Sequence, residues 1–153
     1  QAFLIDVKKE ATKAADPAYD RRLPLFEGSI EGKDIFVVPV RGKGLWDAIW
    51  GFVAMDKDMV IHGVYFDHKG ETPGLGAEIK QRYFMDDFKG EGFLVDGNFA
   101  GIAVAKGNND PKNLIKDDQE VDALAGATIT GDGLSAMLKK DIRLYVPYFK
   151  SLN

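Results

Sequence analysis

At residues 49–66 the chain reads IWGFVAMDKDMVIHGVYF. Two runs rich in β-branched and aromatic residues, Ile49–Met55 and Val60–Phe66, lie on either side of the short polar segment Asp56-Lys57-Asp58. Such runs favour strands, and a short polar connection between them favours antiparallel pairing. The stretch therefore predicts a β-hairpin.

Further strands are predicted on both sides of this hairpin. Ile35–Val40 is an apolar run that is typical of a buried or an edge strand, and Pro39 within it favours the edge. Gly101–Lys106 is another short apolar run, which ends at the turn-forming segment Gly107–Pro111. The strands thus outnumber the helices in the first two thirds of the chain.

Helices are predicted over residues 3–15, closed by Asp16-Pro17, over Ala77–Phe84, and from about Leu134 to Phe149. In the last of these, helical spacing relates Leu134, Met137, Leu138, Ile142, Tyr145 and Phe149. Thr130 or Asp132 is a suitable cap for its first turn. Strands followed by a long helix indicate an α+β fold: a mostly antiparallel twisted sheet with flanking helices, in a single domain over residues 1–153.

The composition excludes several classes of function. The 153 residues carry a net charge of -4 without a lysine- or arginine-rich tract, so we expect no nucleic-acid binding. With no cysteine, the chain can hold neither a disulfide nor an iron–sulfur cluster. Its two histidines, His62 and His68, lack ligand-spaced partners, so no metal site is expected. Redox chemistry would require an organic cofactor.

The segment before the final helix is the strongest indication of function. It reads Asp122-Ala123-Leu124-Ala125-Gly126-Ala127-Thr128. The unpaired N–H groups and the positive dipole end of a helix favour a phosphate, so Thr128 lies where a phosphate ester can be held. Gly-Ala-Thr before a helix is also common as a turn and cap that need no ligand, and the local pattern leaves both interpretations open.

Three separated blocks resemble the FMN-binding domains of ion-pumping respiratory complexes. The segment that ends at Thr128 is similar to the flavinylation motif Asp-x-x-(Ser/Thr)-Gly-Ala-Thr of that family, except that Ala125 stands where the family usually carries serine or threonine. The other two blocks are Glu71-Thr72-Pro73-Gly74-Leu75-Gly76 and Gly42-Lys43-Gly44-Leu45-Trp46. The last block, with Trp46, resembles the branch formed by the C subunit of the sodium-translocating NADH:quinone oxidoreductase.

This resemblance implies a function. A dedicated FMN transferase, using FAD, would esterify the FMN phosphate onto Thr128, and the domain would relay electrons between a metal centre in neighbouring membrane subunits and another covalent flavin. The family carries a membrane helix immediately upstream, so we expect an anchor that this chain lacks. The resemblance places the domain at the cytoplasmic membrane, facing the periplasm.

The resemblance also implies a set of cofactor-binding residues. Beside Thr128 these are Asp122, Gly126, Ala127 and Thr130. In the loop Glu71–Gly76, we expect Gly74 and Gly76 to let the backbone approach a planar ligand, Thr72 to offer a hydroxyl and Leu75 an apolar surface. We predict that this loop, with Glu71, lies against the isoalloxazine or ribityl part of the flavin.

Charged residues upstream of the motif allow two interpretations. Lys116 could supply positive charge to a phosphate or a reduced flavin, or it could be a solvent-exposed lysine. The acidic run Asp117, Asp118, Glu120 and Asp122 is predicted to be a solvated loop.

Two other functions stay open from the sequence. The related G subunit of electron-transport complexes, which serves a ferredoxin:NAD reductase, shares the motif that ends at Thr128 and the Glu71–Gly76 block. A flavin-binding accessory module without electron transfer is the other alternative, because Ala125 removes a hydroxyl from the motif. Thr128, which matches the esterified threonine, is present.

Overall fold

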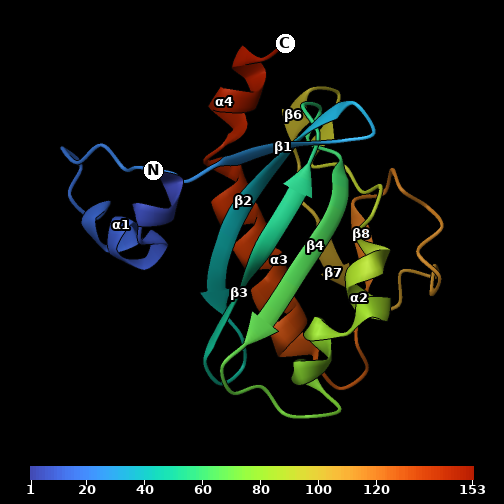
Figure 1. Cartoon of the computed structure of the whole chain (residues 1–153). Coiled ribbons are helices and arrows are strands. Elements are labelled where there is room, and N and C mark those ends of the chain that lie inside the picture. Colours follow the sequence, from blue (N-terminus) through green and yellow to red (C-terminus); the bar gives the residue numbers. More distant parts are fainter.

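The computed structural model covers residues 1–153 and has a four-stranded antiparallel sheet with a long helix behind it (Figure 1). The predicted α+β class is confirmed. The helices are η1 Ala2–Leu4, α1 Val7–Lys13, η2 Gly76–Lys80, α2 Arg82–Asp87, α3 Thr128–Arg143 and α4 Val146–Ser151. The strands are β1 Phe26–Ile30, β2 Lys33–Lys43, β3 Ala48–Met55, β4 Ile61–His68, β5 Leu94–Val95, β6 Asn98–Phe99, β7 Ala103–Ala105 and β8 Glu120–Asp122.

The predicted hairpin is confirmed as β3 and β4. These strands pair in antiparallel register through Val53 and Val64, within the sheet order β1-β2-β3-β4. Asp56 stabilises the turn, because its carboxylate accepts the N–H groups of Asp58 at 3.0 Å and of Val60 at 3.1 Å. The side chain of the first turn residue, Asp56, thus stabilises the turn through hydrogen bonds to the backbone that follows it.

The prediction that the Ile35–Val40 strand lies at the sheet edge was wrong. This strand is β2, and it pairs with β1 on one side and with β3 on the other. The pairing with β1 extends only to Val37, however. Pro39 lies beyond it, where one edge of β2 is open and the missing proline N–H removes no ladder hydrogen bond.

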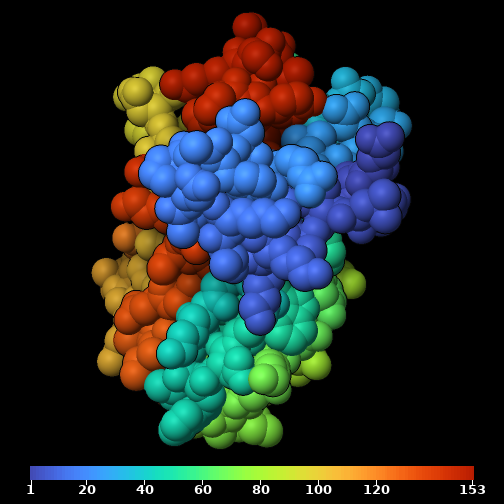
Figure 2. Space-filling model, turned by 90° about the vertical axis from the view of Figure 1, so that its left-hand side faces the viewer, coloured from blue at the N-terminus to red at the C-terminus, as the bar shows by residue number.

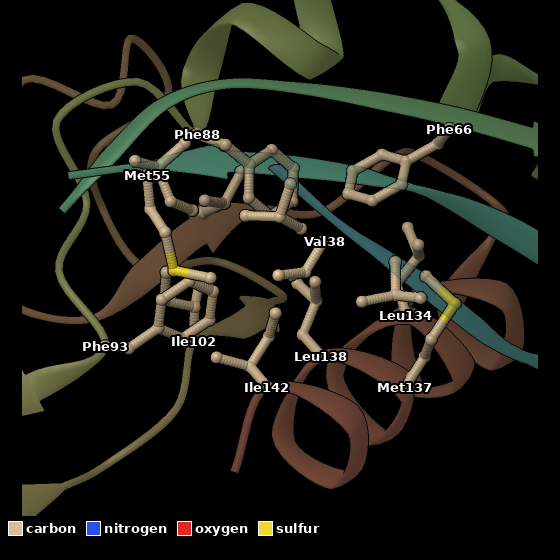
Figure 3. Packing of buried hydrophobic residues seen from close by; sticks show 14 of the residues in the cluster. Val38, Met55, Phe66, Phe88, Phe93, Ile102, Leu134, Met137, Leu138 and Ile142 are labelled. Carbon is tan, nitrogen blue, oxygen red and sulfur yellow. The ribbon is translucent and has the colours of Figure 1, made fainter. Parts of the chain in front are cut away.

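Helix α3 covers one face of the sheet and completes the core. Its apolar side, with Leu134, Met137, Leu138 and Ile142, packs against the inward residues of β2 to β4 (Figure 3). Gly42 permits this close approach, since a Cβ at that position would lie 2.7 Å from Met137 Cβ. None of the helices has both the length and the apolar character needed to cross a bilayer.

The helix boundaries differ from those predicted. The final helix begins at Thr128 with Ala127 as its N-cap, so the prediction that Thr130 or Asp132 caps it was wrong. It does not continue to Phe149 but breaks after Arg143, because Pro147 lacks the N–H that an unbroken helix would need. Residues 3–15 and 77–84 each form two short pieces instead of one helix.

The acidic run Asp117–Asp122 is only partly a loop. Glu120–Asp122 forms β8, which pairs in parallel with β7 through Val121 and Val104. Val121 is fully buried, and its burial stabilises the strand conformation of the segment. Its neighbours Glu120 and Asp122 therefore lie in the strand and are half-buried. For these residues the prediction of a solvated loop was wrong.

Candidate functional site

Three loops meet at the N-terminal end of α3, at the lower end of the sheet in Figure 1. They are residues 44–47 between β2 and β3, residues 69–75 after β4, and residues 123–127 after β8. Together with the first turn of α3 they form a cleft of about 250 Å³. The residues that line it are Leu45, Glu71, Thr72, Leu75, Gly76, Gly126, Ala127, Thr128, Ile129 and Thr130.

Thr128 is the first residue of α3, and its side chain is exposed. No side chain caps this helix end, so the N–H groups of the first turn remain available. The preceding Gly126 turns the chain into the helix with a φ of +69°. A Cβ at that position would lie 2.6 Å from Leu75 Cδ2, so glycine also keeps the two loops in contact.

Glu71 lies beneath the cleft and ties two of the loops to the first turn of α3. Its carboxylate, only 4% exposed as a residue, accepts hydrogen bonds from Leu45 N at 3.2 Å, Trp46 N at 3.0 Å and Thr130 Oγ1 at 2.5 Å. Burial opposes its ionisation, but these donors together outweigh burial and hold the pKa of Glu71 below its usual range. The ionised carboxylate therefore joins the β2–β3 loop to the first turn of α3.

Two further glycines make room for this carboxylate. A Cβ on Gly76 would lie 2.5 Å from Thr130 Oγ1 and 2.7 Å from Glu71 Oε2. A Cβ on Gly44 would lie 2.6 Å from Glu71 Oε1. A Cβ at either position would force the Glu71 carboxylate or its neighbours to shift.

Apolar side chains stand exposed around the cleft. Leu45, Leu75 and Ile129 are 41%, 42% and 57% exposed, and Trp46 lies next to them with its indole N–H 3.2 Å from Thr72 Oγ1. Exposed apolar side chains gathered at one cleft typically mark a binding surface. The arrangement suits a ligand with a flat apolar part and a phosphate directed toward α3.

The structure brings together most of the predicted site residues. Gly126, Ala127, Thr128, Thr130, Glu71, Thr72, Leu75 and Gly76 all line the cleft. Thr130 as a whole is 1% exposed, and its hydroxyl donates to Glu71. These two side chains therefore support the cleft from below.

Three predicted residues lie outside the cleft lining. Gly74 is in the loop, where its N–H donates to Glu78 at 3.1 Å, and Asp122 is in β8. Lys116 donates to the carbonyl of Asp87 at 2.7 Å and its Nζ lies 3.6 Å from Glu91 Oε1, so its charge is paired outside the cleft.

Sequence reasoning missed two lining residues. Leu45 belongs to the Gly-Lys-Gly-Leu-Trp block, which carried the resemblance but received no role in binding. Ile129 follows Thr128 directly, and its apolar character at an exposed helix position was the available signal.

Comparison with known proteins identifies the family. The family described as "FMN-binding domain" matches residues 44–143, which include the β2–β3 loop, Glu71 and Thr128. This chain belongs to the FMN-binding domain family.

Relatives of known name agree with this assignment. The C subunit of the Na(+)-translocating NADH-quinone reductase from Pseudomonas aeruginosa is 36% identical over 110 residues, which cover 71% of this chain and 42% of that protein. The C subunit from Yersinia pestis is 39% identical over 100 residues, 64% of this chain and 36% of that protein. The chain thus spans less than half the length of these relatives, to which it is homologous.

Solved structures share the fold. The crystal structure of the C subunit of this reductase from Parabacteroides distasonis superposes with a TM-score of 0.84 and 36% identity, covering 100% of this chain and 72% of that chain. NqrC from Shewanella oneidensis gives a TM-score of 0.69 and 31% identity, covering 86% of this chain and 62% of that one.

Proposed function

We propose that this chain is the flavin-carrying domain of an electron-transfer subunit similar to NqrC, and that it holds FMN through a phosphoester to Thr128 Oγ. The observation that carries this proposal is the place of Thr128. Its exposed hydroxyl lies at the first residue of an uncapped 16-residue helix and borders a cleft with apolar walls.

The three threonines of the cleft are not equivalent as acceptors. Thr130 is buried and its hydroxyl donates to Glu71, whereas Thr72 accepts the indole N–H of Trp46. Thr128 is exposed, and its hydroxyl has no hydrogen-bond partner in the protein. It is therefore the threonine whose modification would disturb no existing contact.

The phosphoester fits the electrostatics at this position. Thr128 Oγ would attack the FMN-side phosphorus of FAD on a transferase, the bond to the AMP phosphate would break, and the hydroxyl proton would pass to the transferase. The resulting phosphodiester keeps one negative charge, which the N–H groups and dipole of α3 stabilise. No rearrangement of Glu71 is needed, because its carboxylate already accepts three hydrogen bonds within the protein.

The chain's own residues would orient and shield the cofactor. Leu45, Leu75 and Ile129 supply apolar contact for the ring, and the loop that carries Gly76 brings backbone close to it. When bound, FMN supplies the electron-transfer chemistry that the side chains of this chain lack. A covalent tether keeps it at a high effective concentration where free flavin is scarce.

We place this function in the sodium-translocating NADH:quinone reductase, on the periplasmic side of the cytoplasmic membrane. The support is the homology to the C subunit, whose name assigns it to that reductase. Partners would be the membrane subunits of the complex and, during maturation, an FMN transferase.

The experiment is co-production of the domain with an FMN transferase, followed by denaturing electrophoresis and detection of flavin fluorescence in the protein band. The wild-type domain should retain fluorescence after denaturation, and Thr128→Ala should lose it. Thr72→Ala is the matched control, because it removes a second threonine from the same cleft and should leave the band fluorescent. A fluorescent Thr128→Ala band would overturn the proposal.

A further inference from the structure

A second cleft, of about 380 Å³, lies at the open edge of β2, between α1 and the C-terminal half of α3. The N-terminal segment, α3 and β2 come together on this face in Figure 2. The lining residues are Val7, Lys8, Ala11, Thr12, Arg21, Arg41, Gly42, Lys43, Lys140 and Asp141. The two clefts share no lining residue, although Lys43 of this cleft is only two residues from Leu45 of the flavin cleft. Along α3, Lys140 is twelve residues from Thr128, or about 18 Å at 1.5 Å per residue.

Five of the lining side chains are cations, and they come from different parts of the chain. Lys8 lies in α1, Arg21 precedes β1, Arg41 and Lys43 lie in β2, and Lys140 lies in α3. None of the five forms a salt bridge within the protein, although the chain as a whole carries a net charge of -4. The cleft therefore carries a local excess of positive charge, although the chain as a whole is acidic.

The one acidic residue of this cleft does not neutralise the cations. Asp141 is 4% exposed, and its carboxylate accepts the backbone N–H of Arg41 at 2.8 Å. Asp141 thereby provides the acceptor for one backbone N–H, that of Arg41, on the open edge of β2. Burial raises the pKa of Asp141, despite the hydrogen bond from Arg41 and nearby positive charge.

Two N–H donors near this cleft are candidates to bind an anion: Nε of Arg21 and the backbone N–H of Lys43. The Nε of Arg21 is buried without a hydrogen-bond partner. In β2, Gly44 N donates to Asp47 O on the β3 side, whereas Arg41 N donates to Asp141 on the opposite side. Because N–H directions alternate along a strand, Lys43 N also points to this open edge. Buried donors without acceptors are costly, and an oxyanion would supply acceptors.

We propose that this cleft binds a phosphate group, carried either by a small soluble ester or by a phospholipid headgroup. Lysine and arginine side chains from separate elements, a backbone N–H and an unpartnered guanidinium N–H are the donors that phosphate oxygens accept. Only two of the ten lining residues, Val7 and Ala11, are hydrophobic. The volume exceeds that of an isolated phosphate and leaves room for the group that carries it.

The test uses NMR spectra of the ¹⁵N-labelled domain during titration with inorganic phosphate, with sodium chloride at matched ionic strength as reference. Backbone signals of Arg41, Lys43 and Lys140 should shift and saturate with phosphate only. The double variant Arg41→Gln/Lys140→Gln should bind phosphate at least fivefold more weakly. Lys112→Gln/Lys150→Gln removes the same charge from exposed positions outside the cleft and should bind as the wild type does.

Co-sedimentation with vesicles distinguishes the two sources of phosphate. If vesicles that contain phosphatidic acid bind the domain and phosphatidylcholine vesicles do not, and the cleft variant loses this binding, the headgroup is the source. Binding of inorganic phosphate without vesicle binding points to a soluble ester. The proposal is overturned if the wild type shows no saturable shift with phosphate and no vesicle binding, or if both double variants weaken binding equally. Circular dichroism of each variant confirms that it is folded.

Discussion

Replacing Thr130 with valine tests the contact that holds the flavin cleft in shape. Thr130→Val removes the hydroxyl that donates to Glu71 over 2.5 Å and puts a methyl group in its place. Both residues are buried, so water cannot take over the lost hydrogen bond. The Glu71 carboxylate would keep only the two backbone donors from Leu45 and Trp46.

The expected cost follows from the kind of bond. A hydrogen bond to an ionised group contributes about 1.5–3 kcal/mol, and the methyl group is larger than the hydroxyl it replaces. Little space is available, because a Cβ on Gly76 would already lie 2.5 Å from this hydroxyl. We therefore expect the free energy of unfolding at pH 7 to fall by about 2–3 kcal/mol. For a domain of this size that corresponds to a decrease of roughly 4–12 °C in Tm.

The pH dependence provides a second check. Because the pKa of Glu71 is lowered in the folded protein, its contribution is present above the pKa of the unfolded chain and is lost as pH falls through the folded-state value. The difference between wild type and Thr130→Val should therefore shrink below pH 4.5. Urea unfolding of the apo domain, followed by circular dichroism at pH 7 and at acidic pH, measures both effects.

The matched control is Thr128→Val, two residues away and exposed. Its hydroxyl has no partner, so its stability should stay within about 0.5 kcal/mol of the wild type. If Thr130→Val were as stable as Thr128→Val at pH 7, the Glu71–Thr130 contact would not hold the loops to α3, and the reasoning would fail.

Three further variants test other parts of the structure. Gly76→Ala should destabilise by about 1–3 kcal/mol in urea unfolding, because its Cβ would meet side-chain oxygens at 2.5 and 2.7 Å, whereas Gly28→Ala, with nothing within 4 Å, should cost under about 1 kcal/mol. Gly126→Ala combines a φ of +69° with a 2.6 Å approach to Leu75, so flavin incorporation should fall in co-production assays, while normal incorporation would contradict the assigned cleft shape. Burial raises the pKa of Glu91 to about 7, so this group destabilises the fold as pH rises from about 4.5 to 7. Glu91→Gln should therefore gain stability relative to wild type between pH 5 and pH 8, and a pH-independent difference would refute this.

Local patterns were enough to predict the centre of the fold. The β3–β4 hairpin follows from two apolar runs and a turn whose Asp56 closes it. The apolar spacing of α3 similarly predicts the helix that covers the sheet. Its start was harder to predict, because no side chain caps it and the usual cap signal at Thr130 or Asp132 falls inside the helix. Its break was signalled in the sequence by Pro147, which the apolar spacing to Phe149 outweighed in the prediction.

The supporting role of Glu71 could not be predicted from sequence. Its partners are 25, 26 and 59 residues away in the chain, and no local pattern relates them. The same applies to Lys116, which stands near the motif in sequence but lies against Asp87 and Glu91. Thr128, by contrast, was singled out because Asp122–Thr128 is a contiguous segment whose resemblance to the flavinylation motif can be seen in the sequence, although the local pattern alone also fitted a turn and cap.

The most direct test of the account is peptide mapping by mass spectrometry of the domain after co-production with an FMN transferase. We expect a mass increase equal to FMN minus water on the peptide that contains Thr128, with fragment ions that assign it to that residue. The same increase on a peptide that contains Thr72, or no covalent adduct under these conditions, would contradict the central claim.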